Sequence, residues 1–336
     1  MTESFRVSLG MALLALVVLL PGCFGGQLPF GDLLAATPTA SSTLLRATQP
    51  TPTPGSTPPA GLKPYGRIVF AQAGRIGLWQ NGSVRFLTDG ETDSQPAWSP
   101  DGSRIAYVTR GEMSSDLYTL RLDAGSPEQL TRYRAARADV WVFKPAWSPD
   151  GKLISYLTDA TTIDLALWSM NTSGGGTRRL AVIDWRGGID GYSWSPDGKQ
   201  LAIAGFRSDQ EQIWLYTLDT GRWQPLTNVK DGAYDPQFSP DGRRIAFVAR
   251  DADRHDIWAM DPSGGNQIRL TDDGTSRSPA WSPNGEYIAF LSVRGSQFEV
   301  SVTFSMPPTG SARGTGAVPL MPGQSVDSVG GLSWSR

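Results

Sequence analysis

The only histidine of the chain, His255, is the first candidate for acid–base chemistry. A serine–histidine–aspartate triad also needs a serine that the fold brings to the imidazole. The sequence contains no Gly-x-Ser-x-Gly motif that would present one, and a single histidine is too few for a multi-histidine metal site. Residues 251–256 are expected to form a loop between two strands. We therefore interpret His255 as a solvated loop residue and expect no catalytic residue.

Three aspartates in the same segment, Asp251, Asp253 and Asp256, raise the question of a calcium site. They lack the glycine and the later glutamate of an EF-hand loop. Asp116 stands at the same place in another repeat, at the start of a strand, which favours a structural role for Asp256. The sequence has neither a nucleotide-binding motif nor paired cysteines, so we expect no metal and no cofactor.

Tryptophan and arginine offer better candidates for a binding site. Of twelve tryptophans, nine recur at two positions of a sequence repeat and Trp223 lies near an outer turn, which leaves Trp141 and Trp185. Both lie in connections between repeats, beside arginines, and aromatic residues with arginine are typical of recognition hot spots on loops. The alternative is that Trp141 folds back onto its own loop and that each arginine pairs with a nearby aspartate. The candidate binding face comprises Arg110, Arg134, Arg137, Trp141, Trp185, Arg186, Arg207, Arg250 and Arg294.

The elements that must position these residues follow from the repeat. An aromatic residue is followed by a Ser-Pro-Asp-Gly turn, with Asn for Asp in one copy, and a sixth copy stops after its Trp-Ser. A period near 45 with about four strands per repeat is typical of a β-propeller blade. The aromatic anchors, which are 49, 47, 44, 43 and 53 residues apart, are Trp98, Trp147, Trp194, Phe238, Trp281 and Trp334.

The repeat that starts at Pro236 shows the expected blade. Residues 236–239 form the inner strand, 244–248 the second, 256–260 the third and 267–271 the outer strand. Proline and glycine supply the backbone angles of the tight turn between the first two strands. The polar residues of these turns are interpreted as turn formers and not as catalytic groups: Asp101, Asp150, Asp197, Asp241 and Asn284.

The two ends of the repeat region complete each other. Residues 67–70 match a second strand without its inner strand, while residues 332–335 match an inner strand without a continuation. Pairing them makes a sixth blade and removes an exposed sheet edge. The sequence thus predicts an all-β, six-bladed β-propeller over residues 63–336 that is closed by pairing of its two ends.

The repeat resembles the TolB-like β-propeller family, which is built from WD40-like or PD40 repeats. The shared pattern is Trp/Phe-Ser-Pro-Asp/Asn-Gly-x-x-Ile-Ala-Phe/Tyr, then Asp-Ile/Leu-Trp/Tyr and Leu-Thr, over nearly all of 63–336. Propellers of prolyl-oligopeptidase-type peptidases share it. The resemblance implies protein contacts at a bacterial cell envelope, although a fold alone does not determine function. Residues 24–62 are too short and too proline-rich for the α/β domain that precedes the TolB propeller, and we expect no hydrolase domain.

The start of the chain predicts export and lipid attachment. Residues 7–20 are apolar but shorter than the roughly 20 residues of a membrane span, and Leu20-Pro21-Gly22-Cys23 resembles a bacterial lipobox. We expect a lipoprotein signal peptide at 1–22 and a lipid on Cys23, the only cysteine. The alternative is a plain signal peptide or anchor with an incidental cysteine. Residues 23–62 are rich in Pro, Thr and Ser and predict a disordered linker.

These expectations lead to three hypotheses for function. The first is a non-enzymatic module, lipid-anchored at the outer face of the plasma membrane, that binds an unidentified envelope protein or peptide. The second is a propeller enzyme or glycan-binding protein with a site at the mouth of the channel, and the third is an accessory partner of a separate peptidase. The net charge of −2 gives no general attraction to nucleic acid. We expect a monomer.

Overall fold

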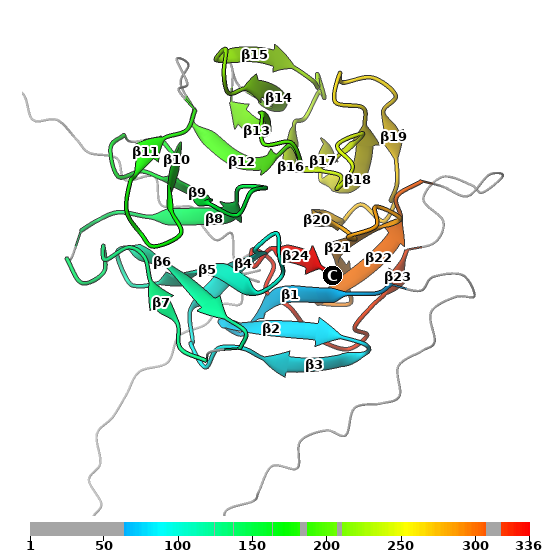
Figure 1. Cartoon of the computed structure of the whole chain (residues 1–336). Coiled ribbons are helices and arrows are strands. Elements are labelled where there is room, and N and C mark those ends of the chain that lie inside the picture. Colours follow the sequence, from blue (N-terminus) through cyan, green and yellow to red (C-terminus); the bar gives the residue numbers. More distant parts are fainter. Residues whose placement is uncertain are drawn as a thin grey trace, which may run out of the picture. The chain divides into compact units, whose positions relative to one another are not determined.

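The residues that the structure describes form six four-stranded antiparallel sheets. This computed structural model describes residues 64–123, 125–136, 138–162, 164–181, 187–206, 210–306 and 317–336. Figure 1 shows the sheets arranged around a common centre, with the first strand of each sheet innermost. The prediction of an all-β, six-bladed propeller is confirmed. Within the described ranges, no helix is both long and apolar enough to cross a membrane.

Each blade runs from an inner to an outer strand. Blade 1 consists of β24 (Leu332–Ser335), β1 (Arg67–Gln72), β2 (Arg75–Gln80) and β3 (Ser83–Phe86), and blade 2 of β4 (Asp93–Trp98), β5 (Arg104–Arg110), β6 (Ser115–Arg121) and β7 (Glu128–Gln129). Blade 3 consists of β8 (Val142–Trp147), β9 (Leu153–Thr158), β10 (Ala166–Asn171) and β11 (Arg178–Arg179), and blade 4 of β12 (Ile189–Trp194), β13 (Gln200–Phe206), β14 (Glu211–Thr217) and β15 (Arg222–Pro225). Blade 5 consists of β16 (Ala233–Phe238), β17 (Ile245–Asp251), β18 (Arg254–Met260) and β19 (Ile268–Arg269), and blade 6 of β20 (Arg277–Trp281), β21 (Tyr287–Arg294), β22 (Gln297–Phe304) and β23 (Val318–Pro319).

The two ends of the repeat region close the ring, as predicted. Strand β24 pairs with β1 in antiparallel register, with Ser335 opposite Arg67 and Leu332 opposite Phe70. Figure 1 places the C-terminus beside β1. The pairing covers the edge of β1, which would otherwise be unpaired and open to association with another strand.

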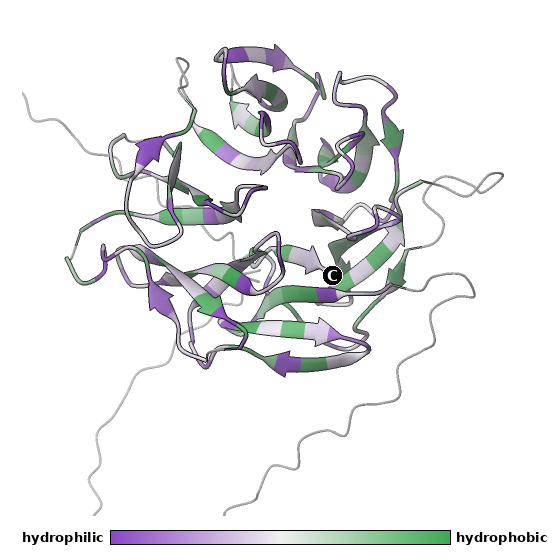
Figure 2. Ribbon diagram, viewed as in Figure 1, coloured by the Kyte–Doolittle hydropathy of each residue, from purple (hydrophilic) through white to green (hydrophobic). Residues whose placement is uncertain are grey.

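The hydrophobic core is divided into six clusters, each between two adjacent blades. Every cluster contains one aromatic anchor of the repeat, as Trp98 does between blades 1 and 2 and Trp334 between blades 6 and 1. Figure 2 shows apolar residues along the inner and middle strands and hydrophilic residues on outer strands such as β11. The anchors therefore hold neighbouring blades together, which is why they recur once per repeat.

The Ser-Pro-Asp-Gly turns have the structural role that the sequence predicts. In blade 2, Ser99 Oγ donates to Asp101 Oδ1 at 2.6 Å, and the Ser103 backbone N–H donates to the same oxygen at 3.0 Å. These hydrogen bonds, that from Ser99 first, lower the pKa of Asp101 to about 2. Gly102 has a φ of 66°, which a residue with a Cβ adopts at a cost. Equivalent serine–aspartate bonds recur at Asp150, Asp197 and Asp241.

The propeller has two different faces. The Ser-Pro-Asp-Gly turns lie on one of them, which we call the turn face. The inter-blade connections lie on the other, the connection face, together with the loops between second and third strands. Contacts between the two kinds of segment confirm their common location: the Ser115 backbone N–H donates to Val140 O at 3.1 Å, and the Trp141 backbone N–H donates to Asp159 Oδ1 at 2.7 Å.

Candidate functional site

Four inner strands carry an unusual backbone at the residue that precedes a proline. Gln95, Lys144, Asp235 and Ser278 have φ values of 55°, 47°, 49° and 53°, and each stands before a proline of the repeat. Left-handed backbone at a residue other than glycine costs about 1–3 kcal/mol. Strain of this kind, repeated around the ring, indicates that the direction of these side chains matters.

A β-bulge at the same place turns these side chains. The register between β8 and β9 shifts between Phe143 and Ala146, and that between β16 and β17 shifts between Tyr234 and Gln237. A bulge re-aims one side chain out of the alternating pattern of a strand. Here the bulges bring together side chains from blades that are not neighbours.

An ion pair reaches from blade 3 to blade 5. Lys144 Nζ lies 2.8 Å from Asp235 Oδ1 and 3.8 Å from Asp190 Oδ2 in blade 4. Between the two blades lies Gly191, where a Cβ would be only 3.3 Å from Lys144 Nζ. The glycine of blade 4 therefore makes room for the lysine to cross. Lys144, Asp190, Asp235 and the nearby Glu211 form what we call the axial cluster.

Further hydrogen bonds extend this arrangement around the propeller axis. The Lys144 backbone N–H donates to Gln95 Oε1 at 2.7 Å, and the Gln95 backbone N–H donates to Gly330 O at 2.8 Å. On the other side, Ser278 Oγ donates to Asp235 Oδ2 at 3.5 Å. Bulged residues of blades 2, 3, 5 and 6 thus contact one another near the axis.

Acidic groups outnumber basic ones in the axial cluster. Desolvation alone would lower the pKa of Lys144, but the charges of Asp235 and Asp190 outweigh it and raise the pKa above its ordinary value. Desolvation, followed by the charge of Asp190, raises the pKa of Glu211 to about 8. Among the described residues, the buried oxygen Glu211 Oε1 has no hydrogen-bond partner. The cluster is therefore prepared to accept a further donor or positive charge.

A second, more basic group lies beside the axial cluster in blades 5 and 6. Tyr234 Oη is 2.6 Å from His255 Nδ1, and the tautomer decides which atom donates. Desolvation and then the charges of Arg277 and Arg250 lower the pKa of His255. A Cβ at Gly232 would lie 3.3 Å from Glu211 O and 3.6 Å from a guanidinium nitrogen of Arg250, so the two groups adjoin.

The prediction that His255 lies in a loop was wrong. His255 belongs to β18 and is paired with Arg250 of β17, and its ring packs edge-on against Tyr234. The sequence Asp-Ala-Asp-Arg-His-Asp appears loop-like because it is polar, but the hairpin turn is confined to its first residues. Asp256 has the predicted structural role: its carboxylate accepts hydrogen bonds from Arg269, Thr271 and the Gly274 backbone.

The axial cluster lies towards the connection face. Glu211 is the first residue of β14, and Arg250 is the next-to-last residue of β17, so both adjoin the loops between second and third strands. This is the face on which the candidate binding residues were predicted. Of those residues, Arg250 borders the cluster directly.

The other predicted residues are more scattered. Trp141 stacks on Phe143 of its own segment, with ring centroids 6.2 Å apart, and Arg294 Nε lies 3.9 Å from Glu299. Arg250 Nε donates to Asp231 O at 2.6 Å. Trp141 thus packs within its own segment, whereas Arg294 faces a glutamate and Arg250 a main-chain carbonyl and not an aspartate carboxylate. Their role in binding stays a prediction.

Arg110 belongs to blade 2, and Arg134 lies in the connection from blade 2 to blade 3. Arg110 ends β5, and its buried Nε has no hydrogen-bond partner within the described residues. The Arg134 backbone N–H donates to Asp116 Oδ2 at 3.3 Å, while its side chain is exposed. The predicted residues that lie outside the described part of the chain are Cys23, Arg137, Trp185, Arg186 and Arg207.

Lys144, Asp190, Glu211 and Asp235 were absent from the predicted set. A signal for two of them is present in the sequence: the position before the repeat proline varies while its surroundings recur. In the six repeats this position holds Gln95, Lys144, Gly191, Asp235, Ser278 and Gly331. Because the residue at this position varies inside an otherwise regular core strand, core packing does not determine its identity.

Comparison with known proteins agrees with this architecture. The model of the TolB beta propeller domain (PD40) matches residues 189–305. An uncharacterized protein of Agrobacterium fabrum is 32% identical over 206 residues, covering 57% of this chain and 67% of that protein. The Tol-Pal system protein TolB of Bordetella parapertussis is 37% identical over 204 residues, 59% of this chain and 44% of that protein.

A solved structure extends the similarity to the whole propeller. The crystal structure of TolB from Acinetobacter baumannii superimposes with a TM-score of 0.63 at 22% identity, covering 80% of this chain and 66% of that one. At this identity the superposition supports the fold alone. The chain spans less than half the length of the Bordetella TolB that it matches. With the repeat pattern, the six blades and the sequence matches taken together, the chain belongs to the TolB-like β-propeller family.

Proposed function

We propose that this protein is a non-enzymatic binding module of the cell envelope, held at the outer face of the plasma membrane by a lipid on Cys23. It binds a protein or peptide at the connection face, where the axial cluster and Arg250 adjoin. The Tol-Pal system protein TolB among its relatives supports a role in the envelope.

The observation that carries the proposal is the pair of Lys144 and Asp235. Two strained, bulged residues from blades 3 and 5 are held 2.8 Å apart next to two more carboxylates. A stable core needs no such arrangement, because apolar residues of similar volume stabilise as well or better. Charged residues that a scaffold holds in a fixed direction favour specific recognition instead.

The charges suggest how a partner is recognised. A lysine, an arginine or an amino terminus of the partner would approach Asp190, the carboxylate of the axial cluster whose side chain is 49% exposed. Acidic groups of the same partner would meet Arg250 on the neighbouring side. A segment with both charges therefore fits this surface better than a uniformly charged one.

Photo-cross-linking tests the face directly. A benzoyl-phenylalanine placed at Arg134, which is exposed on the connection face, should form a discrete cross-linked product in membranes of the source organism. The same probe at Lys152, which is exposed on the turn face, should give none. Adding Asp235→Asn to the Arg134 probe should reduce the product at least about tenfold, as expected for a hot spot.

The melting temperature of each probe variant must first match that of the natural protein, because a misfolded bait captures partners unspecifically. If the Lys152 probe gives the product and the Arg134 probe does not, the binding face is assigned wrongly. Equal products at both positions would contradict a single face.

The lipid anchor has its own test. Replacing Cys23 by alanine should abolish incorporation of labelled fatty acid and leave the chain uncleaved at this position, because the thiol is the attachment atom. Cys23→Ser offers the matched control, since a hydroxyl keeps the size of the side chain but does not form the thioether. Undiminished labelling of either variant would contradict the lipoprotein hypothesis.

A further inference from the structure

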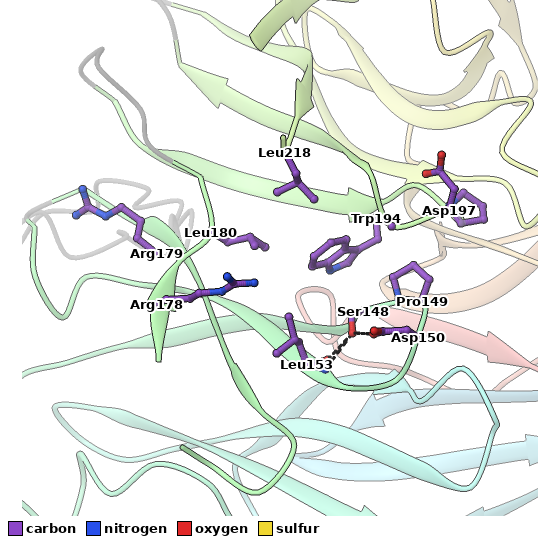
Figure 3. A pocket seen from close by; sticks show the side chains of 12 residues that line it. Ser148, Pro149, Asp150, Leu153, Arg178, Arg179, Leu180, Trp194, Asp197 and Leu218 are labelled. Carbon is purple, nitrogen blue, oxygen red and sulfur yellow. Dashed lines mark hydrogen bonds between the residues drawn. The ribbon is translucent and has the colours of Figure 1, made fainter. Parts of the chain in front are cut away.

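A pocket of about 550 Å³ opens on the turn face between blades 3 and 4. Figure 3 shows its apolar wall, made by Pro149, Leu153, Leu180, Trp194 and Leu218. This volume lies within the range of about 300–1,000 Å³ that is typical of ligand sites, and polar groups contribute at least as much of the lining as apolar ones. The pocket lies on the face opposite the axial cluster, and the proposed function makes no use of it.

Trp194 differs from the other anchors. Those five are only 7–9% exposed, whereas Trp194 is partly exposed in the wall of the pocket. Its indole N–H donates to Ser155 Oγ at 2.9 Å, while those of Trp147 and Trp281 donate to main-chain carbonyls.

Ser155 accounts for the difference. The other second strands have alanine or valine at this position, so a hydroxyl is special to blade 3. Ser155 Oγ itself donates to Ala146 O at 3.0 Å, the carbonyl equivalent to the one that Trp147 uses in the preceding blade. The Ser155 hydroxyl therefore replaces this carbonyl as the acceptor of the indole N–H, and one side of the Trp194 ring faces the pocket.

Arg178 supplies a positive charge to the pocket. It alternates along β11 with Arg179, so their side chains lie on opposite sides of the strand. Arg179 stacks over Trp168, 5.8 Å from the ring centroid, and points away in Figure 3, whereas Arg178 points towards Trp194. Within the described residues, no hydrogen bond or ion pair engages the Arg178 guanidinium.

Two carboxylates lie across the pocket from Arg178, with Trp194 between them in Figure 3. Asp150 accepts from Ser148 Oγ and from the Lys152 backbone N–H, and Asp197 accepts in the same way from Ser195 and Lys199. Asp150 Oδ2 also lies 3.7 Å from Lys152 Nζ in an exposed ion pair, which a bound donor would have to replace. Among the described residues, no hydrogen bond or ion pair engages Asp197 Oδ2, which remains available to a further donor. The pocket thus presents the N–H groups of the Arg178 guanidinium at one side, the Trp194 ring in the middle and aspartate carboxylates at the other side.

We propose that this pocket binds the carboxyl terminus of a peptide that ends in a bulky apolar residue. The terminal carboxylate accepts the two parallel N–H bonds of Arg178. The last side chain packs against Trp194 and the leucines, and a backbone N–H or a basic side chain upstream donates to Asp150 or Asp197. A fatty acid would satisfy Arg178 and the apolar wall but has no donor for the two aspartates.

Fluorescence polarisation with defined peptides tests this proposal on the full-length protein. The probes are fluorescein-labelled hexapeptides Gly-Ser-Gly-Ser-Lys-X, where X is Leu, Phe, Trp or Val, each as free acid and as carboxamide. At least one free acid should bind saturably, and its carboxamide should bind about tenfold or more weakly, since a charge-assisted bond is lost. Arg178→Gln should weaken the free acid to the same extent and leave the carboxamide unchanged.

Arg179→Gln is the matched control, because Arg179 lies at the same pocket but its guanidinium is engaged over the Trp168 ring. It should keep the affinity within about twofold, since surface contacts outside a hot spot contribute little. The proposal is overturned if no free acid binds at millimolar concentration, if acid and carboxamide bind equally, or if Arg179→Gln weakens binding as much as Arg178→Gln. These outcomes are independent of the axial cluster, so the proposed function and this proposal can fail separately.

Discussion

Deleting residues 331–336 should lower the free energy of unfolding by about 3–5 kcal/mol, the usual cost of removing a buried tryptophan. Trp334 is 9% exposed in the core between blades 6 and 1, and its indole N–H donates to Tyr65 O at 2.8 Å. The deletion also leaves the inner edge of β1 unpaired. Urea unfolding followed by tryptophan fluorescence gives the free energy, and light scattering reports association through the open edge.

Two further variants separate the contributions to closure. Removing only Arg336 takes away the bond from Arg67 Nε to Arg336 O at 2.6 Å, which is exposed, and should cost less than about 1 kcal/mol. Trp334→Ala keeps the strand but removes the packing, and should account for most of the loss. A deletion variant that unfolds at the same urea concentration as the natural protein would contradict closure by the two ends.

The closure could be predicted because it depends on local patterns. The aromatic anchors and the Ser-Pro-Asp-Gly turns recur, and each has a local physical cause. Trp98 packs in the core between two blades, and Gly102 supplies the positive φ of the turn. Strand ends were predicted less well: β17 extends to Asp251 and β18 begins at Arg254. Pairing in the hairpin continues through polar residues, since main-chain hydrogen bonds do not require an apolar side chain.

The axial cluster could not be predicted in the same way. Lys144 lies in β8, which begins at Val142, and the direction of its side chain depends on a bulge and a left-handed φ. The contact with Asp235 further depends on Gly191, which lies in the blade between them. Such a site combines three blades, so no window of sequence contains it. Trp141, in contrast, was conspicuous in the sequence because no repeat explained it.

The ionisation of Glu211 should make the protein less stable as the pH rises from about 4.5 to about 8. Desolvation and the charge of Asp190 raise the pKa of Glu211 from 4.5 to about 8 in the folded state. Between these values the folded protein holds a proton that the unfolded chain has lost. The free energy of unfolding therefore falls with pH, by at most about 1.4 kcal/mol per pH unit, and levels off above pH 8. The positive charge of Lys144 opposes the shift, and the negative charge of Asp235 adds to it.

Glu211→Gln should remove this dependence, because the amide keeps the hydrogen-bonding shape of the protonated acid and does not ionise. The variant should be more stable than the natural protein above pH 8 and similar to it near pH 5. The lowered pKa of His255 acts in the opposite direction: between that lowered pKa and 6.5 the unfolded chain holds the extra proton, so stability there rises with pH. The measured quantity is therefore the difference between the two proteins at each pH, in which the histidine cancels.

Glu128→Gln is the matched control for the loss of a carboxylate. Glu128 is exposed on the outer strand β7, far from the axis, and its replacement should leave the pH profile of the natural protein in place. Parallel profiles for Glu211→Gln and the natural protein would show that Glu211 is already ionised at neutral pH. In that case the axial cluster would carry a fuller negative charge, and a basic group of the partner would bind without releasing a proton from it.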